Sequence, residues 1–226
     1  MQDAALTQSS EASEQVFSWT LAAADQAATL RLARHLATFV GAGDLVTLSG
    51  GLGVGKTTFA RALIRVLLDD PAIEVPSPTF TLMQVYEEGR FPLIHADLFR
   101  LHGPAELEAL GWDEMSEHAL VLVEWPERAG VDAARDRLDI GLALPAGGPA
   151  EARSIVLTGW GQWRRRLELA KAAFDLVAAG GFGDAARDFI QGDASTRAYE
   201  RLRRQGEAGE SVILMISPTQ SVARGK

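Results

Sequence analysis

Three observations predict an α/β fold with three layers and a mostly parallel central sheet. An apolar segment, Leu45–Leu48, runs into the glycine-rich segment Gly50–Thr57, which has the spacing Gly-x-x-x-x-Gly-Lys-Thr. Apolar residues at helical spacing follow from Phe59 to Leu68. Strand, glycine loop and helix in this order form the P-loop of nucleotide-binding proteins. Further strand-like and helical segments alternate after it, so the sequence predicts a fold of the P-loop NTPase type.

The residue types of the loop suit a triphosphate. Glycines at 50, 53 and 55 permit backbone angles closed to other residues, so that successive N–H groups can surround a phosphate. Lys56, one of only three lysines, would reach the terminal phosphates, and the Thr57 hydroxyl would bind Mg²⁺. A plain glycine turn between a strand and a helix is the alternative, but the complete context favours nucleotide binding. The expected nucleotide-binding residues of the loop are Gly50, Leu52, Gly53, Val54, Gly55, Lys56, Thr57 and Thr58.

Composition narrows the classes of protein that this chain could represent. Its 226 residues suit one domain with a small appendage, and hydrophobic residues make up 47%, enough for a core. No apolar stretch approaches the ~20 residues of a membrane span, and no leader-like segment opens the chain. The absence of cysteine excludes disulfides and agrees with a cytoplasmic location. A net charge of −8 argues against direct gripping of nucleic acid, so a role near RNA would act through a partner protein.

The remaining elements follow from apolar spacing and turn residues. Residues 1–14 read as a disordered lead-in, and Asp25 is expected to cap a helix. Glu87–Arg90 is expected to turn a β-hairpin, and Pro104 to open a short helix that ends before Gly111. The expected strands are 16–21, 45–48, 80–86, 91–97, 119–124, 138–144 and 154–158, and the other helices 26–39 and 163–179. We therefore expect a P-loop domain over 15–162 and an appendage over 163–226 that begins with a linker helix.

Two acids end apolar strands and are candidates to complete the site. Glu124 follows five apolar residues, and Asp97 follows Leu93-Ile94. Acids at the carboxyl ends of parallel strands can face a phosphate on the P-loop, which favours Glu124 as the metal-positioning acid. Asp97 could equally cap a turn. His95 would share a strand face with Asp97, either as a metal pair or as a packed histidine. Trp125 could cover the nucleotide or pack on the surface.

Five blocks in this order resemble the TsaE (YjeE) family, over the region from Val16 to about Thr158. The blocks are Leu52–Phe59, Ser77–Leu82, His95–Leu101, Glu106–Gly111 and Leu122–Arg128. The resemblance implies a small Mg²⁺-dependent ATPase that works with TsaB and TsaD in making threonylcarbamoyladenosine beside the tRNA anticodon. ATP hydrolysis in this family resets the modifying complex, and activity without the partners is expected to be weak.

The resemblance also implies roles for single residues. Lys56 holds phosphate, Thr57 and Glu124 hold the metal ion, and Asp97 is required for hydrolysis. Trp125 lies beside the nucleotide, and the segment 77–81 responds to it and meets the partner. Gly51 stands where the family usually has an acid, and Phe99 where it usually has tyrosine. Neither departure should remove phosphate binding.

The C-terminal segment carries a separate resemblance. Gly192–Tyr199 followed by Ser211–Met215 looks like the start of an aminoglycoside phosphotransferase-like kinase lobe. Met215 stands about where such a lobe has its ATP lysine, and no histidine follows His118. We therefore expect an incomplete lobe without activity of its own.

Two other functions stay open from the sequence. A P-loop small-molecule kinase would need an acceptor pocket and usually an arginine-bearing lid. The segment that contains the expected hairpin, from Glu87 to Glu124, offers only Arg90 and Arg100. An adaptor gated by nucleotide without hydrolysis would share every binding residue and differ only at Asp97 and Glu124. The lack of an Asn-Lys-x-Asp motif favours ATP over GTP.

Overall fold

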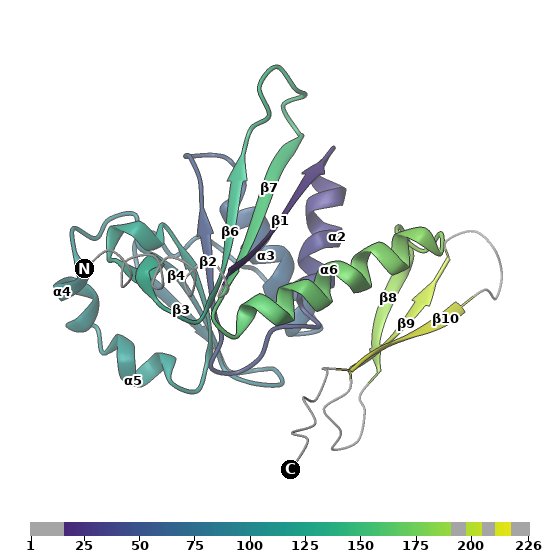
Figure 1. The fold of residues 1–226 in the computed structure, drawn as a ribbon. Coiled ribbons are helices and arrows are strands. Elements are labelled where there is room, and N and C mark those ends of the chain that lie inside the picture. Colours follow the sequence, from purple (N-terminus) through teal and green to yellow (C-terminus); the bar gives the residue numbers. More distant parts are fainter. Residues whose placement is uncertain (1–15, 191–197, 205–210, 218–226) are drawn as a thin grey trace, which may run out of the picture. The chain divides into compact units, whose positions relative to one another are not determined.

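The computed structural model describes residues 16–190, 198–204 and 211–217 (Figure 1). The chain forms two compact units, with the division between Glu168 and Leu169, inside helix α6 (Trp163–Ala179). The expected lead-in, residues 1–14, lies outside the described residues. No helix among the described residues is long and apolar enough to cross a bilayer.

The first unit is built on a seven-stranded sheet in the order β1-β7-β6-β2-β5-β4-β3. β2, β4, β5 and β6 run parallel at its centre, and β1 has the same direction because two antiparallel pairings separate it from β6. Five of the seven strands therefore share one direction, which confirms the predicted α/β fold. The strands are β1 (Val16–Ala23), β2 (Leu45–Ser49), β3 (Met83–Tyr86), β4 (Leu93–Asp97), β5 (Leu120–Glu124), β6 (Arg137–Ala143) and β7 (Arg153–Trp160).

Helices cover both faces of the sheet because the strands at its centre are apolar on both sides. On β5, Val121 and Val123 pack in a core with Leu107 of α4 (Pro104–Glu108) and Val131 of the 3₁₀ turn η2 (Val131–Ala133). The Glu124 side chain lies on the opposite face of the sheet from Val121 and Val123, where it contacts α3 (Lys56–Leu67). Figure 1 shows α4 and α5 (Trp112–Ser116) near β3 and β4, and α2 (Gln26–Leu36) nearer β1.

Local signals explain where several elements begin and end. The Asp25 carboxylate accepts a hydrogen bond from the Ala28 N–H at 2.7 Å, so the predicted N-cap of α2 is confirmed. α2 ends at Leu36, three residues before the predicted end. α6 has the predicted bounds, and its Trp163 side chain is buried.

The β-hairpin is confirmed, but both of its strands are shorter than predicted. Leu82 adopts a left-handed conformation with φ 65°, and its N–H donates to the Pro78 carbonyl at 2.6 Å. That turn keeps residues 80–82 out of the sheet, so β3 begins only at Met83. Proline at 92 has no N–H for a sheet ladder, and β4 begins after it. The second short helix, α5, was not predicted.

The second unit contains a three-stranded antiparallel sheet in the order β10-β9-β8. Its strands are β8 (Ala186–Ile190), β9 (Ala198–Arg203) and β10 (Ser211–Ile216). Leu202, Leu214 and Glu200 are buried on one face, where Arg187 and Glu200 form an ion pair at 2.9 Å. Residues 192–197 of the kinase-like segment lie outside the described residues, and that resemblance stays a prediction.

Candidate nucleotide-binding site

The P-loop has the backbone that its glycines predict. Gly50, Gly53 and Gly55 have φ of 129°, 74° and 108°, all in the region that favours glycine. Space also requires glycine at position 50, because a Cβ there would lie 2.2 Å from the Leu142 carbonyl oxygen of β6. α3 begins directly after Gly55 without a side-chain cap. Its first N–H groups are therefore available to an anion, as phosphate binding requires.

Lys56 lies within the loop and is almost completely buried. Its ammonium donates to the carbonyls of Gly50 at 2.8 Å and Gly51 at 2.9 Å, and lies 3.6 Å from the centre of the Trp125 ring. Burial lowers the pKa of Lys56 below its ordinary value, and the nearby carboxylates of Glu124, Glu127 and Asp97 partly oppose this effect. The lysine is thus placed at the loop where terminal phosphates would bind.

Thr57 and Glu124 meet as the sequence predicted. The Thr57 hydroxyl, on the first turn of α3, donates to Glu124 Oε2 at 2.9 Å. Glu124 ends β5, the strand next to β2, so the sheet itself brings the carboxylate to the P-loop. A hydroxyl and a carboxylate are hard oxygen donors of the kind that Mg²⁺ prefers beside phosphate. The pair fits the predicted metal site, although Mg²⁺ binding itself stays a prediction.

His95 contacts Glu124 and not Asp97. Its Nε2 lies 3.0 Å from Glu124 Oε1, and the ring is fully buried. Nδ1 has no hydrogen-bond partner among the described residues. The printed contacts of these two residues lead to different partners, because His95 contacts Glu124 and the Asp97 carboxylate accepts from Ser77, Thr79 and the Phe99 N–H, so they do not support the metal pair of His95 and Asp97 considered from the sequence. His95 instead fixes the oxygen of Glu124 that Thr57 does not contact.

Asp97 is held by hydroxyl groups. Its Oδ2 accepts hydrogen bonds from Ser77 at 2.6 Å and Thr79 at 2.8 Å, and Oδ1 accepts one from the Phe99 N–H at 3.0 Å. It is paired in register with Glu124, so the two acids end neighbouring parallel strands. Asp97 therefore connects the end of β4 to the segment 77–79.

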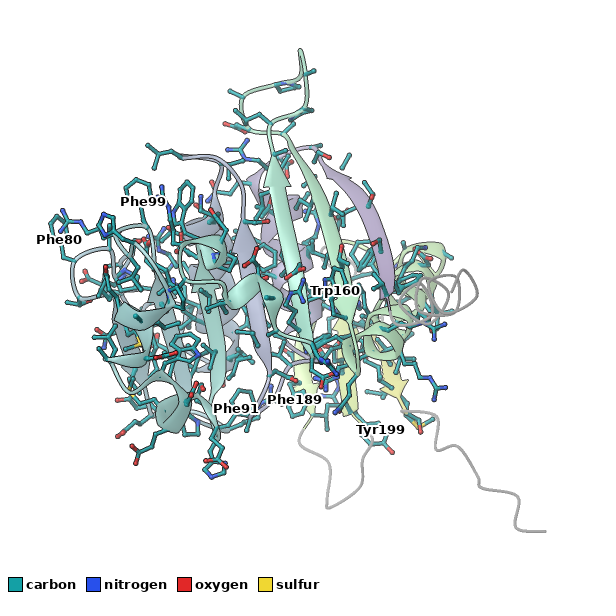
Figure 2. All side chains as sticks on the ribbon, turned by 60° about the vertical axis from the view of Figure 1, so that its left-hand side comes forward. Phe80, Phe91, Phe99, Trp160, Phe189 and Tyr199 are labelled. Carbon is teal, nitrogen blue, oxygen red and sulfur yellow. The ribbon has the colours of Figure 1, made fainter. Side chains whose placement is uncertain are left out.

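Aromatic side chains of the site region contact one another or an arginine: Trp125 and Phe99 contact each other, and Phe80 lies under Arg100. Trp125 has a left-handed backbone with φ 60°, and its ring lies 5.0 Å from that of Phe99, over which Arg128 lies at 5.3 Å. Phe80 is 81% exposed, and Arg100 lies 4.3 Å from its ring centre. Figure 2 shows Phe80 and Phe99 on the same side of the unit. The positive φ of Trp125 turns the indole onto Lys56, which the sequence did not reveal.

Most of the predicted site residues come together, and the structure adds one residue that the sequence did not indicate. Val54 is buried in the loop, whereas Leu52 is exposed at its tip. Arg153, at the start of β7, donates from Nε to the Val54 carbonyl at 2.6 Å. No local pattern could have revealed a contact across 99 positions. His95 was noticed, but without its contact to Glu124.

The geometry agrees with comparisons to known proteins. A family model described as threonylcarbamoyl adenosine biosynthesis protein TsaE matches residues 23–148. The tRNA threonylcarbamoyladenosine biosynthesis protein TsaE of Streptomyces coelicolor is 40% identical over 136 residues, which are 58% of this chain and 90% of that protein. Its namesake in Rickettsia conorii is 40% identical over 99 residues, 44% of this chain. The chain spans only 56% of that Rickettsia protein.

A solved structure is also similar to this chain. The crystal structure of YdiB from Bacillus subtilis is similar with a TM-score of 0.57 and 28% sequence identity. The similarity covers 70% of this chain and 96% of YdiB. The sheet and the P-loop described above thus occur together with a family match over more than half of the sequence. The chain belongs to the TsaE family.

Proposed function

We propose that this chain is the ATP-binding and ATP-hydrolysing component of the machinery that makes threonylcarbamoyladenosine in tRNA. It would act in the cytoplasm with TsaB and TsaD and meet tRNA only through that complex, which suits its net charge of −8. The observation that carries the proposal is the 2.9 Å contact between Thr57 and Glu124 beside a P-loop of suitable backbone. The TsaE names of the relatives support the pathway.

Each residue has a chemical task in this proposal. Lys56 exchanges the carbonyls of Gly50 and Gly51 for phosphate oxygens. Thr57 and Glu124 would hold Mg²⁺, which when bound neutralises charge on the phosphates. His95 keeps the Glu124 carboxylate in its orientation. Trp125 would contact the nucleotide after the ammonium of Lys56 moves toward the phosphates.

Asp97 is the residue that we assign to orienting the attacking water. Both of its oxygens accept hydrogen bonds in the described structure, from Ser77, Thr79 and Phe99. Three of the roughly four acceptor sites of the carboxylate are therefore taken, and little of its capacity is left for a water molecule. We therefore propose that hydrolysis is slow in the isolated chain, and that the partners accelerate it by drawing the segment 77–79 away from Asp97.

The same contacts favour a second candidate, the nucleotide-gated adaptor. If Asp97 never leaves Ser77 and Thr79, ATP binding alone would control docking. The small-molecule kinase gains no such support. Arg90 donates to the Ala37 carbonyl, and Arg100 lies over the Phe80 ring.

The experiment that tests the proposal measures ATP hydrolysis by the full chain alone and with the TsaB–TsaD pair. Strong stimulation by the pair, lost in Asp97→Asn, supports the ATPase. ATP-dependent binding to the pair without phosphate release supports the adaptor. Phosphate transfer to a small acceptor would overturn both.

A further inference from the structure

We propose that Arg153 is a positioning residue of the nucleotide site. It holds the peptide group between Val54 and Gly55 in the orientation that binds phosphate. This inference rests on the proposed nucleotide binding and adds a residue beyond the P-loop motif and the two acids. Arg153 starts β7, and the family model ends before it, at residue 148. Its side chain nevertheless reaches the centre of the glycine loop.

Topology explains why an arginine from β7 can reach the loop. β6 pairs in parallel with β2, so both strands end at the edge of the sheet where the P-loop begins. β7 runs antiparallel to β6, and its first residues therefore return to that same edge. Arg153 Nε donates to the Val54 carbonyl at 2.6 Å, and lies 3.7 Å from the point where a Cβ on Gly55 would stand.

The contact determines which way the Val54–Gly55 peptide faces. The C=O and N–H of a trans peptide point in opposite directions. When Arg153 draws the Val54 carbonyl to one side, the Gly55 N–H must point to the other side, away from β7. Gly55 has φ 108°, in a region where glycine changes conformation at little cost, so its own backbone does not hold this orientation. The hydrogen bond from Arg153 holds it.

The Arg153 side chain is held by carbonyl groups of the segment that precedes β7. Nη1 donates to the carbonyls of Ala150 at 2.6 Å and Ala152 at 2.7 Å, just before β7. These contacts and the one with Val54 are all made to carbonyl oxygens, so they use three of the five guanidinium N–H donors without neutralising the charge. Arg153 therefore adds a positive charge beside the loop in addition to Lys56. Both effects, the peptide orientation and the charge, favour a phosphate.

The test is the affinity of the full chain for ATP, measured by calorimetry without Mg²⁺. We expect Arg153→Ala to weaken binding about tenfold, as for the loss of one charge-assisted hydrogen bond. Arg153→Lys keeps the charge but loses the planar arrangement of the guanidinium donors, and should recover part of the affinity. Arg34→Ala removes the same charge from an exposed position on α2 and should change little.

Further measurements separate positioning from a fold defect and from a wrong function. Ligand-free Arg153→Ala should still unfold cooperatively, at a temperature only slightly below that of the wild type, because three hydrogen bonds are lost. KM for ATP in the stimulated reaction should rise while kcat changes little. Equal ATP affinity in wild type and Arg153→Ala would overturn the inference while leaving the proposed function intact. Failure of the wild-type chain to bind ATP would instead overturn the proposed function.

Discussion

Glu124 and Asp97 stand in register at the ends of two neighbouring parallel strands, but they belong to differently built halves of the site. Glu124 is held by a residue of α3 and by a buried histidine of β4, both in regular elements. Asp97 is held by Ser77 and Thr79, in a segment without regular structure. Loops change conformation more readily than packed helices and strands. We infer that the Glu124 half is preformed for binding and that the Asp97 half is adjustable, which suits a regulated hydrolytic step.

The largest effect is expected from Lys56→Ala, which tests the binding half. Loss of the buried ammonium should weaken ATP affinity by roughly 100-fold or more, because at least two charge-assisted hydrogen bonds to phosphate are lost. Calorimetric titration with ATP measures this. Lys171→Ala, which removes a lysine from an exposed pair with Asp175, is the matched control. An ATP affinity of Lys56→Ala within tenfold of the wild type would show that Lys56 does not bind phosphate.

Asp97→Asn tests whether the other half serves turnover and not binding. We expect hydrolysis with the partners to fall by about 100-fold or more, since a neutral amide orients the attacking water less well than a carboxylate. ATP affinity should stay within about threefold. Ser77→Ala removes one of the hydrogen bonds that occupy Asp97, so it should modestly raise hydrolysis by the chain alone. Equal loss of binding and turnover in Asp97→Asn would abolish the distinction between the halves.

His95 sharpens the comparison, because it supports Glu124 alone. His95→Leu removes the contact at 3.0 Å and should raise the Mg²⁺ concentration needed for tight ATP binding about tenfold. His95→Gln can still donate a hydrogen bond to Glu124, so the Mg²⁺ concentration that it needs should lie close to that of the wild type. ATP affinity measured in EDTA should be alike in all three proteins. A Mg²⁺ dependence that is unchanged in His95→Leu would reduce His95 to a packing residue.

The smallest effect concerns the pH dependence of binding. Burial lowers the pKa of Lys56 in the free protein, and bound phosphate would raise it again. Below the lowered pKa the lysine is already charged. As the pH rises through that pKa toward the ordinary value of 10.5, binding must also take up a proton, so ATP affinity should fall. Lys56→Arg keeps its charge throughout, and its affinity, even if lower, should not decline over this range. A flat wild-type profile would contradict the lowered pKa.

The sequence predicted those parts of the site that depend on residues close together in the chain. The glycine spacing predicted the backbone of the loop, and an acid after an apolar strand predicted Glu124. The contacts of Arg153 and His95 depend on sheet order and register, which a single sequence does not reveal. β3 was predicted too long because apolar residues at 80 and 82 suggested a strand, whereas Leu82 forms a turn with Pro78. For the second unit the sequence offered only a resemblance to the start of a kinase lobe, part of which lies outside the described residues, so that prediction stays untested.

The position of Lys56 over Trp125 has a practical consequence for measurement. An ammonium 3.6 Å from the ring centre perturbs the indole electronically, and phosphate binding would withdraw that ammonium. Fluorescence emission of the unlabelled chain should therefore change when ATP is added, and Trp125→Phe should abolish the change while the other four tryptophans remain. Occupancy of the loop could then be followed in real time by stopped flow, without a dye and in the presence of the partner proteins.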